Sequence, residues 1–311
     1  MKTLEVPLSF LCGKNGVRLY GILHQPEKPS RCGLLIVTGR PALRAGRHRL
    51  FVLLARAWAE AGIPVMRFDF RGTGDCEGEM GTLDDTSEDI ASAIDAFLSN
   101  MPGLEGVAMW GLCGGAADSI FYAPKDPRVM GIAMVNPWYY DARVQGLTIM
   151  RRYGSAGLGK VSRWLRAAGS SIRGNAGTAD SLERQTKSSG TSQDDETDGG
   201  NISEAAVPRA SAAIDAAYAS YRVPNLAQRM ANNLEEFKGG VLLILSGQDT
   251  GSQAFKHAVS ISRRWRRLLS APRMQSHELP EANHSLRRPE WRAQATAWTI
   301  AWLRQLEAQR H

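Results

Sequence analysis

Residues 107–115 constrain the fold more than any other part of the chain, because a short apolar run leads directly into the sequence G-L-C-G-G. Gly111 and Gly115 stand two positions either side of Cys113. This spacing predicts a strand that turns into a helix so sharply that a side chain at either glycine would collide with its neighbours. A cysteine at the tip of such a turn is a candidate nucleophile.

Strand and helix patterns alternate on both sides of this turn. Segments 4–11 and 17–23, joined by K-N-G, predict an opening hairpin. Further strands are expected at 33–38, 64–68, 106–110, 129–135, 241–245 and 274–279, and helices at 47–61, 84–98, 114–123, 252–268 and from residue 289 onwards. The alternation predicts an α/β fold with a mostly parallel, doubly wound sheet that helices cover on both faces.

The alternation stops between residues 138 and 226, where helical fragments and many arginines surround a polar tract, 185–203, that we expect to be disordered. We therefore expect two core parts, 1–137 and 227–311, separated by an insertion over 138–226. Open α/β sheets bind ligands at the carboxyl ends of their strands. An insertion there is expected to act as a lid that selects the substrate.

Composition excludes several classes of protein. With 311 residues, 43% of them hydrophobic, the chain can bury a full core. Residues 1–7 contain an acid and a proline and no long apolar run, so we expect neither a signal peptide nor stable membrane insertion, and a cytoplasmic location. The net charge is +7, but no nucleic-acid motif accompanies it, so no nucleic-acid partner is expected.

Four scattered cysteines without C-x-x-C spacing argue against a zinc site and a disulfide framework, and they are expected to be free thiols: Cys12, Cys32, Cys76 and Cys113. Part of the basic excess lies in R-R-W-R-R, residues 263–267. Apolar residues recur around it at helical spacing: Ala258, Ile261, Trp265 and Leu268. The arginines are thus expected to form the solvated face of a helix, the alternative being a patch for an acidic partner or a membrane surface.

A thiol in the first turn of a helix is close to the positive end of the helix dipole, which favours thiolate, and a nearby histidine would take the proton. His284 fits this role because it follows the last expected strand and precedes the last helix. The other five histidines have ordinary structural explanations: His24, His48, His257, His277 and His311.

The acid that orients such a histidine is expected between nucleophile and base in chain order. Asp249 follows the strand at 241–245 and is our choice. An aspartate before a helix can instead be only an N-cap, and Asp141 after the preceding strand is a rival.

An oxyanion hole requires two backbone N–H groups directed at the developing charge. Gly114 follows the nucleophile, and Arg40 lies in the loop after the strand at 33–38, where Gly39 allows a sharp turn. The alternative is that side chains of this loop bind an anionic substrate group; the candidates are Arg40, Arg44, Arg47 and His48. The glycine-rich stretch 71–78 lacks the phosphate-loop spacing and is interpreted as a turn.

Taken together, these residues resemble the α/β-hydrolase superfamily. The resemblance covers about 33–138 and 238–305 and includes D-F-R-G-T-G-D-C-E-G at 69–78, which is similar to that family's D-x-R-G-x-G-x-S turn with Cys76 in place of serine. More narrowly, 37–49, 71–78, 110–113 and 245–249 resemble the exosortase-A-system-associated hydrolases, which have cysteine at the elbow. The tract 185–203 does not match that family's lid.

That resemblance implies that Cys113 is the nucleophile, His284 the base and Asp249 its orienter, in a protein that works beside bacterial exopolysaccharide and protein-sorting systems. We expect hydrolysis of an ester or thioester in a small-molecule or acylated substrate through an acyl-enzyme, without a metal or organic cofactor. The alternatives are acyl transfer to a sugar or amine acceptor and a non-catalytic binding protein on a hydrolase fold. The sequence does not specify the substrate or the oligomeric state.

Overall fold

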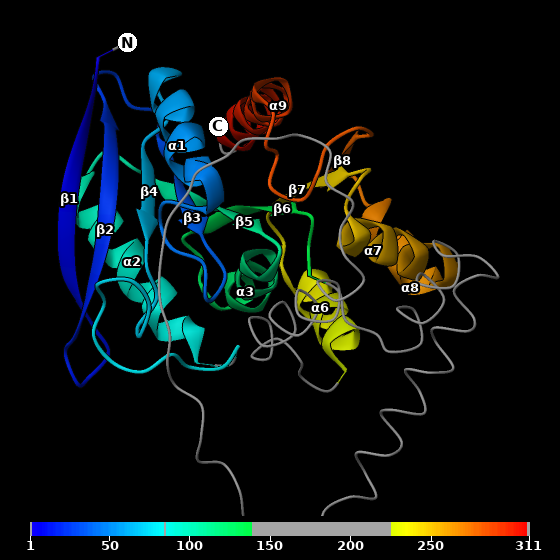
Figure 1. The fold of residues 1–311 in the computed structure, drawn as a ribbon, viewed down its shortest axis with the longest axis horizontal. Coiled ribbons are helices and arrows are strands. Elements are labelled where there is room, and N and C mark those ends of the chain that lie inside the picture. Colours follow the sequence, from blue (N-terminus) through cyan, green and yellow to red (C-terminus); the bar gives the residue numbers. More distant parts are fainter. Residues whose placement is uncertain (1, 84, 139–224, 310–311) are drawn as a thin grey trace, which may run out of the picture. The chain divides into compact units, whose positions relative to one another are not determined.

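The computed structural model describes residues 2–83, 85–138 and 225–309 (Figure 1). The expected insertion, 138–226, lies outside the described residues except at its ends. The polar tract 185–203 and the rival acid Asp141 also lie outside them.

The described residues contain one sheet of eight strands in the order β1-β2-β4-β3-β5-β6-β7-β8. The strands are β1 (Thr3–Cys12), β2 (Val17–Pro26), β3 (Cys32–Val37), β4 (Val65–Phe68), β5 (Gly106–Leu112), β6 (Val129–Val135), β7 (Gly240–Ser246) and β8 (Met274–Leu279). β1 and β2 form the expected hairpin, β2 pairs antiparallel with β4, and the other neighbours are parallel. Strands β3, β5 and β6 are buried along their whole length because helices cover both faces.

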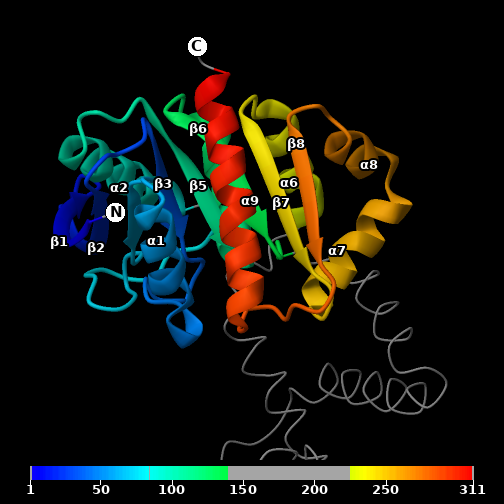
Figure 2. The ribbon, with the colours of Figure 1, turned by 90° about the horizontal axis from the view of Figure 1, so that it is seen from above.

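The described helices are α1 (Leu50–Glu60), α2 (Thr86–Asn100), α3 (Gly114–Tyr122), α6 (Leu226–Glu236), α7 (Thr250–Ile261), α8 (Arg263–Leu269) and α9 (Pro289–Ala308). Trp58 of α1 and Trp302 of α9 are buried in one core on one face of the sheet. Ile90 of α2 and Phe255 of α7 belong to a second core on the other face. Figure 2 shows α1 and α9 together in front of the strands. The predicted doubly wound α/β architecture is confirmed.

Two expected helices differ from the prediction. The first starts at Leu50 instead of residue 47, because His48 and Arg49 have φ angles of 52° and 58° and lie in a separate 3-10 turn. The helix expected at 252–268 is interrupted at Ser262, whose extended backbone (φ −105°, ψ 115°) ends α7. The Ser262 hydroxyl then accepts the Trp265 N–H at 3.3 Å and caps α8.

This interruption corrects one expected core residue. Ile261 is 62% exposed, because the break turns it away from the face that buries Trp265 and Leu268. Arg263, Arg266 and Arg267 are exposed, as a solvated face requires.

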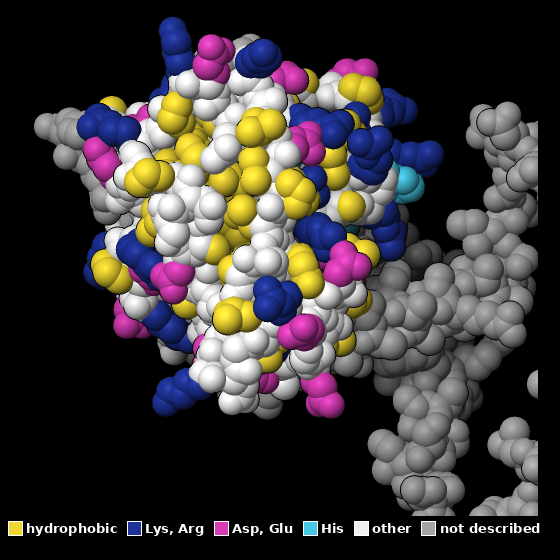
Figure 3. Space-filling view, turned by 90° about the vertical axis from the view of Figure 1, so that its left-hand side faces the viewer, with side chains coloured by type: hydrophobic (Ala, Val, Ile, Leu, Met, Phe, Trp, Pro, Cys, Tyr) yellow, Lys and Arg dark blue, Asp and Glu magenta, His cyan; other side chains and the backbone are white. Residues whose placement is uncertain are grey.

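The hairpin forms one side of the sheet, where β1 is an edge strand. Leu4 and Leu11 of β1 are 61% and 59% exposed. Figure 3 looks onto this side and shows hydrophobic side chains in the middle, with basic and acidic side chains around them. Among the helices that the structure describes, none combines the length and the apolar character needed to cross a membrane.

Candidate active site

Cys113 forms the turn between β5 and α3. Its φ of 57° and ψ of −114° are a strained combination for a residue with a side chain. Its N–H donates to the carbonyl of Val135 at 2.9 Å, and its carbonyl accepts the Trp138 N–H at 3.1 Å. The backbone on both sides of the thiol is therefore tied to the end of the neighbouring strand β6.

The two glycines of this turn have the predicted steric role. A Cβ atom on Gly111 would lie 2.3 Å from the carbonyl of Gly115, and one on Gly115 would lie 2.0 Å from the carbonyl oxygen of Val37. Both distances are far below any allowed contact, so the sharp turn that the spacing predicts is confirmed.

The loop after β3 packs directly against this turn. A Cβ atom on Gly39, which has a φ of 70°, would lie 2.3 Å from the backbone nitrogen of Gly115. The close approach brings the Arg40 backbone beside the first turn of α3, where the Gly114 N–H belongs to the amides that have no acceptor within the helix. This arrangement is compatible with the expected oxyanion hole, which stays a prediction.

Two of the four candidate side chains of this loop, those of Arg40 and Arg44, face carboxylates. Arg40 and Asp118 are both buried and make an ion pair of 3.2 Å. Arg44 pairs with the buried Asp69 and, at 2.7 Å, with Asp75. The guanidinium groups of Arg40 and Arg44 are thus already neutralised, which argues against the alternative that they bind the substrate.

Asp249 uses its two carboxylate oxygens for different tasks. Oδ2 accepts the Ser252 N–H at 2.8 Å and the Ser252 hydroxyl at 3.0 Å, so it caps α7. Oδ1 lies 3.1 Å from Nδ1 of His284, in the loop after β8. The N-cap interpretation and the predicted histidine contact are therefore both correct.

The electrostatics of His284 follow from this contact. Burial by itself would lower the pKa of His284, but hydrogen bonds with Asp249 and Cys113, together with the charges of both, raise it to about 10. Burial acts to raise the pKa of Asp249, but the hydrogen bond and the charge of His284 outweigh it and lower that pKa. The structure thus places the imidazole of His284 in contact with Asp249, through Nδ1, and with the side chain of Cys113. Their catalytic roles stay a prediction.

Two of the other histidines, His24 and His277, have local explanations. The buried His24 accepts a hydrogen bond from Nε of Arg67 at 3.0 Å, and burial, with the charge of Arg67, lowers its pKa to about 4. His277 stacks on Trp298 with ring centroids 4.3 Å apart.

The glycine-rich stretch 71–78 is a turn, as predicted. At Cys76, where the family pattern has serine, the thiol accepts the Tyr20 N–H and donates to the Asp69 carbonyl, both at 3.2 Å. The sulfur thus makes the contacts that a hydroxyl would make. All four cysteines are buried free thiols, as expected.

Sequence reasoning missed Asn136, which immediately follows β6. Its side chain bonds to Ser246 and to the carbonyl of His284, and it also accepts the hydroxyl of Ser252, which contacts Asp249. The available signal was an amide residue at the carboxyl end of the strand next to the Cys113 turn, in the sequence N-P-W.

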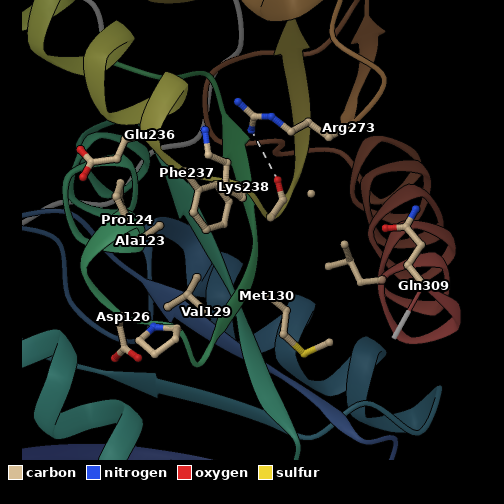
Figure 4. Close-up of a pocket in the computed structure, with 14 residues that line it drawn as sticks. Ala123, Pro124, Asp126, Val129, Met130, Glu236, Phe237, Lys238, Arg273 and Gln309 are labelled. Carbon is tan, nitrogen blue, oxygen red and sulfur yellow. Dashed lines mark hydrogen bonds between the residues drawn. The ribbon is translucent and has the colours of Figure 1, made fainter. Parts of the chain in front are cut away.

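A pocket of about 490 Å³ lies elsewhere, at the starts of β6 and β7 (Figure 4). Val129, Phe237 and Arg273 are among the residues that line it, and Arg273 donates to the Gly239 carbonyl at 3.4 Å. Cys113, by contrast, follows the carboxyl end of its strand. The pocket and the candidate site therefore lie at opposite ends of the parallel strands.

Comparison with known proteins supports the observed fold. Residues 45–288 match the model of a hydrolase family described as serine aminopeptidase, S33. No curated protein matches the chain. Among solved structures, the chain is similar to an esterase of Pyrococcus furiosus, PF2001, with a TM-score of 0.62, 14% identity, and coverage of 97% of this chain and 91% of that one.

Two further similar structures come from complexes. DcsB bound to its substrate analogue has a TM-score of 0.60 and 18% identity, covering 97% of this chain and 99% of that one. Est1E from Butyrivibrio proteoclasticus with ferulic acid bound has a TM-score of 0.56 and 15% identity, with the same coverage of 97% and 99%. At these identities the similarity supports the fold.

Proposed function

The chain belongs to the hydrolase family described as serine aminopeptidase, S33, and on this basis we propose that it cleaves an ester or thioester with Cys113 as nucleophile. The observation that carries the proposal is the combination of Cys113 at a strained strand-to-helix turn with a His284 that is held by Asp249 at 3.1 Å. The family description names a serine, whereas the residue that we propose as nucleophile is a cysteine.

In the first half of the reaction, the Cys113 sulfur attacks the acyl carbon, and the electron pair of the carbonyl moves to its oxygen. The N–H groups of Gly114 and Arg40 stabilise that oxyanion. The tetrahedral adduct then collapses, the bond to the leaving alkoxide or thiolate breaks, and Nε2 of protonated His284 gives the leaving group its proton. The product is a thioester on Cys113.

In the second half, neutral His284 takes a proton from water, and the hydroxide oxygen attacks the thioester carbon. The adduct expels the Cys113 thiolate and releases a carboxylic acid. Asp249 does not change its protonation: it accepts the Nδ1–H of His284 in both halves and stabilises the imidazolium. The raised pKa of His284, about 10, supports the imidazolium form at neutral pH.

The proposal favours activated esters and thioesters over amides. A thiolate is a good leaving group, so an amide adduct would return to substrate more readily than it would expel an amine. The esterase of Pyrococcus furiosus among the similar structures supports an ester substrate. The resemblance of 37–49 and 110–113 to the exosortase-associated hydrolases further supports a substrate of bacterial exopolysaccharide or sorting systems.

The test compares wild type with Cys113→Ala and His284→Ala, using p-nitrophenyl acetate and a matched acetyl thioester. The matched control is Cys32→Ala, which removes a different buried thiol, at the start of β3. Product release is followed by absorbance, and the acetyl adduct by intact mass after rapid quenching in acid.

Wild type and Cys32→Ala are expected to turn over both substrates and to carry one acetyl group when quenched. Both activities and the adduct should disappear in Cys113→Ala, while His284→Ala should lose turnover. Retained activity in Cys113→Ala would exclude this nucleophile. A folded wild type that neither turns over nor becomes acylated would favour the binding-protein alternative.

A further inference from the structure

Asn136 is buried at the junction of the three loops that carry the candidate catalytic residues. It is 1% exposed, and its φ of 44° falls in the left-handed region, which asparagine tolerates better than most residues. Its backbone N–H donates to the carbonyl of Ile244 in β7 at 3.0 Å. The residue is therefore anchored by its backbone before its side chain makes any contact.

The side chain of Asn136 uses its full hydrogen-bonding capacity. Oδ1 accepts the Ser246 N–H at 2.7 Å and the Ser252 hydroxyl at 2.8 Å. Nδ2 donates to Oγ of Ser246 at 2.9 Å and to the carbonyl oxygen of His284 at 3.0 Å. A backbone N–H only donates and a carbonyl only accepts, so these partners allow only one orientation of the amide.

These partners lead directly to the Asp249–His284 contact. Ser246 precedes the Asp249 turn, and its carbonyl accepts the Asp249 N–H at 3.3 Å. Ser252 holds the carboxylate of Asp249 through both its N–H and its hydroxyl. The fourth contact of Asn136 holds the backbone of His284 itself.

The Ser252 hydroxyl has one proton and two acceptors, Oδ1 of Asn136 at 2.8 Å and Oδ2 of Asp249 at 3.0 Å. It can make a full hydrogen bond to only one of them at a time. The amide of Asn136 and the carboxylate of Asp249 are therefore coupled through this hydroxyl, besides their connection through the backbone of Ser246.

We propose that Asn136 is a positioning residue for the proposed reaction, because its one amide fixes the acid loop and the histidine loop relative to each other. Without it, the backbone of His284 loses the hydrogen bond from the Asn136 amide, and the 3.1 Å approach of Nδ1 to Asp249 is no longer enforced. The inference rests on the proposed function where activity is measured. Its second measurement, the titration of His284, does not depend on catalysis.

The main variant is Asn136→Ala, which removes all four contacts without adding charge. Asn136→Asp has nearly the same size and keeps both acceptor contacts, but it cannot donate to the His284 carbonyl. It remains informative if the alanine variant does not fold. The control is Ile132→Val, a substitution in the buried strand β6, which precedes Asn136, that lowers stability without touching the network.

Three quantities are measured for each variant: the thermal midpoint, kcat and KM for p-nitrophenyl acetate, and the titration of His284 by NMR with labelled histidine. The His284 signal is assigned by its absence in His284→Asn. In Asn136→Ala we expect the pKa of His284 to fall from about 10 towards its ordinary value, and kcat to fall by at least about 10-fold with little change in KM. Asn136→Asp should lose kcat as well, and Ile132→Val should lower only the thermal midpoint.

The positioning role is overturned if Asn136→Ala and Asn136→Asp keep the wild-type kcat and His284 titration while losing stability, since a purely structural residue behaves in that way. This failure is distinguishable from failure of the proposed function. If wild type has no esterase activity but Asn136→Ala still shifts the His284 titration, the proposed function fails and the positioning role stands.

Discussion

Nδ1 of His284 lies 3.1 Å from Oδ1 of Asp249, and the other oxygen of the same carboxylate caps helix α7. The acid is thus held by the helix that follows it and is not free to rotate away from the imidazole. This arrangement leaves Nε2 of His284 to interact with Cys113. Proton transfer at the candidate site therefore depends on a carboxylate whose position is set by secondary structure.

Cys113→Ser tests whether the site uses the thiol as a thiolate. A serine hydroxyl must lose its proton during the attack, so it needs a neutral His284, whereas a thiolate does not. We expect the variant to fold and its kcat/KM at neutral pH to fall by on the order of 10²-fold, the range in which general-base catalysis contributes. The measurement is kcat/KM for p-nitrophenyl acetate in both proteins.

The loss of kcat/KM in Cys113→Ser should become smaller as the pH rises, because the serine needs a neutral His284. Losing the Cys113 contact removes one of the causes that raise the pKa of His284, so the neutral imidazole forms at a lower pH. A serine variant as active as wild type at neutral pH would contradict a thiolate mechanism.

The alkaline limb of activity should report His284. Burial opposes protonation, but Asp249 and Cys113 outweigh it and raise the pKa of His284 to about 10, so activity is expected to persist through neutral pH and to fall near pH 10. In Asp249→Asn the alkaline limb of the pH profile should move to lower pH.

The measurement is kcat/KM for an unactivated alkyl ester by pH-stat. The control is Asp85→Asn, which changes an exposed carboxylate at the N-cap of α2. An alkaline limb at the same pH in wild type and Asp249→Asn would exclude His284 as its source.

The same pKa shift makes a prediction about stability. A histidine whose pKa is higher in the folded than in the unfolded chain stabilises the fold fully below its ordinary value of 6.5, and this contribution disappears as the pH rises through about 10. The difference in free energy of unfolding between wild type and His284→Asn should therefore shrink from pH 6 to pH 10. Urea unfolding of both proteins at several pH values measures it. A difference that grows with pH would contradict the raised pKa.

The Cys113 turn could be predicted because its information is local. Two glycines spaced around one cysteine specify the turn within five residues, and the Cβ distances at Gly111 and Gly115 follow from that geometry. Asp249 and His284 could be placed because each lies in the loop that follows a strand, and the carboxyl ends of parallel strands meet on the same side of the sheet.

Asn136 could not be predicted in this way. Its partners Ser246, Ser252 and His284 lie 110, 116 and 148 residues away in the chain, and the register of β6 with β7 and of β7 with β8 brings them together. The break at Ser262 was missed for a related reason. The apolar spacing continues through it, and only an extended backbone with a serine cap separates α7 from α8.

Gly115→Ala should break the contact that joins the loop after β3 to the Cys113 turn. The added Cβ would lie 2.0 Å from the Val37 carbonyl oxygen, so the backbone must shift, at a cost of about 1–3 kcal/mol or more in the free energy of unfolding. The matched control is Gly103→Ala, because a Cβ there has nothing within 4 Å.

The backbone shift in Gly115→Ala also moves the Gly114 amide. The kcat of Gly115→Ala should therefore fall by more than the loss of folded protein explains, whereas the kcat of Gly103→Ala should not change. Urea unfolding and active-site titration with an acylating ester measure both effects. Equal stability and equal kcat in the two variants would mean that the turn tolerates a side chain, and the steric argument that first pointed to Cys113 would lose its basis.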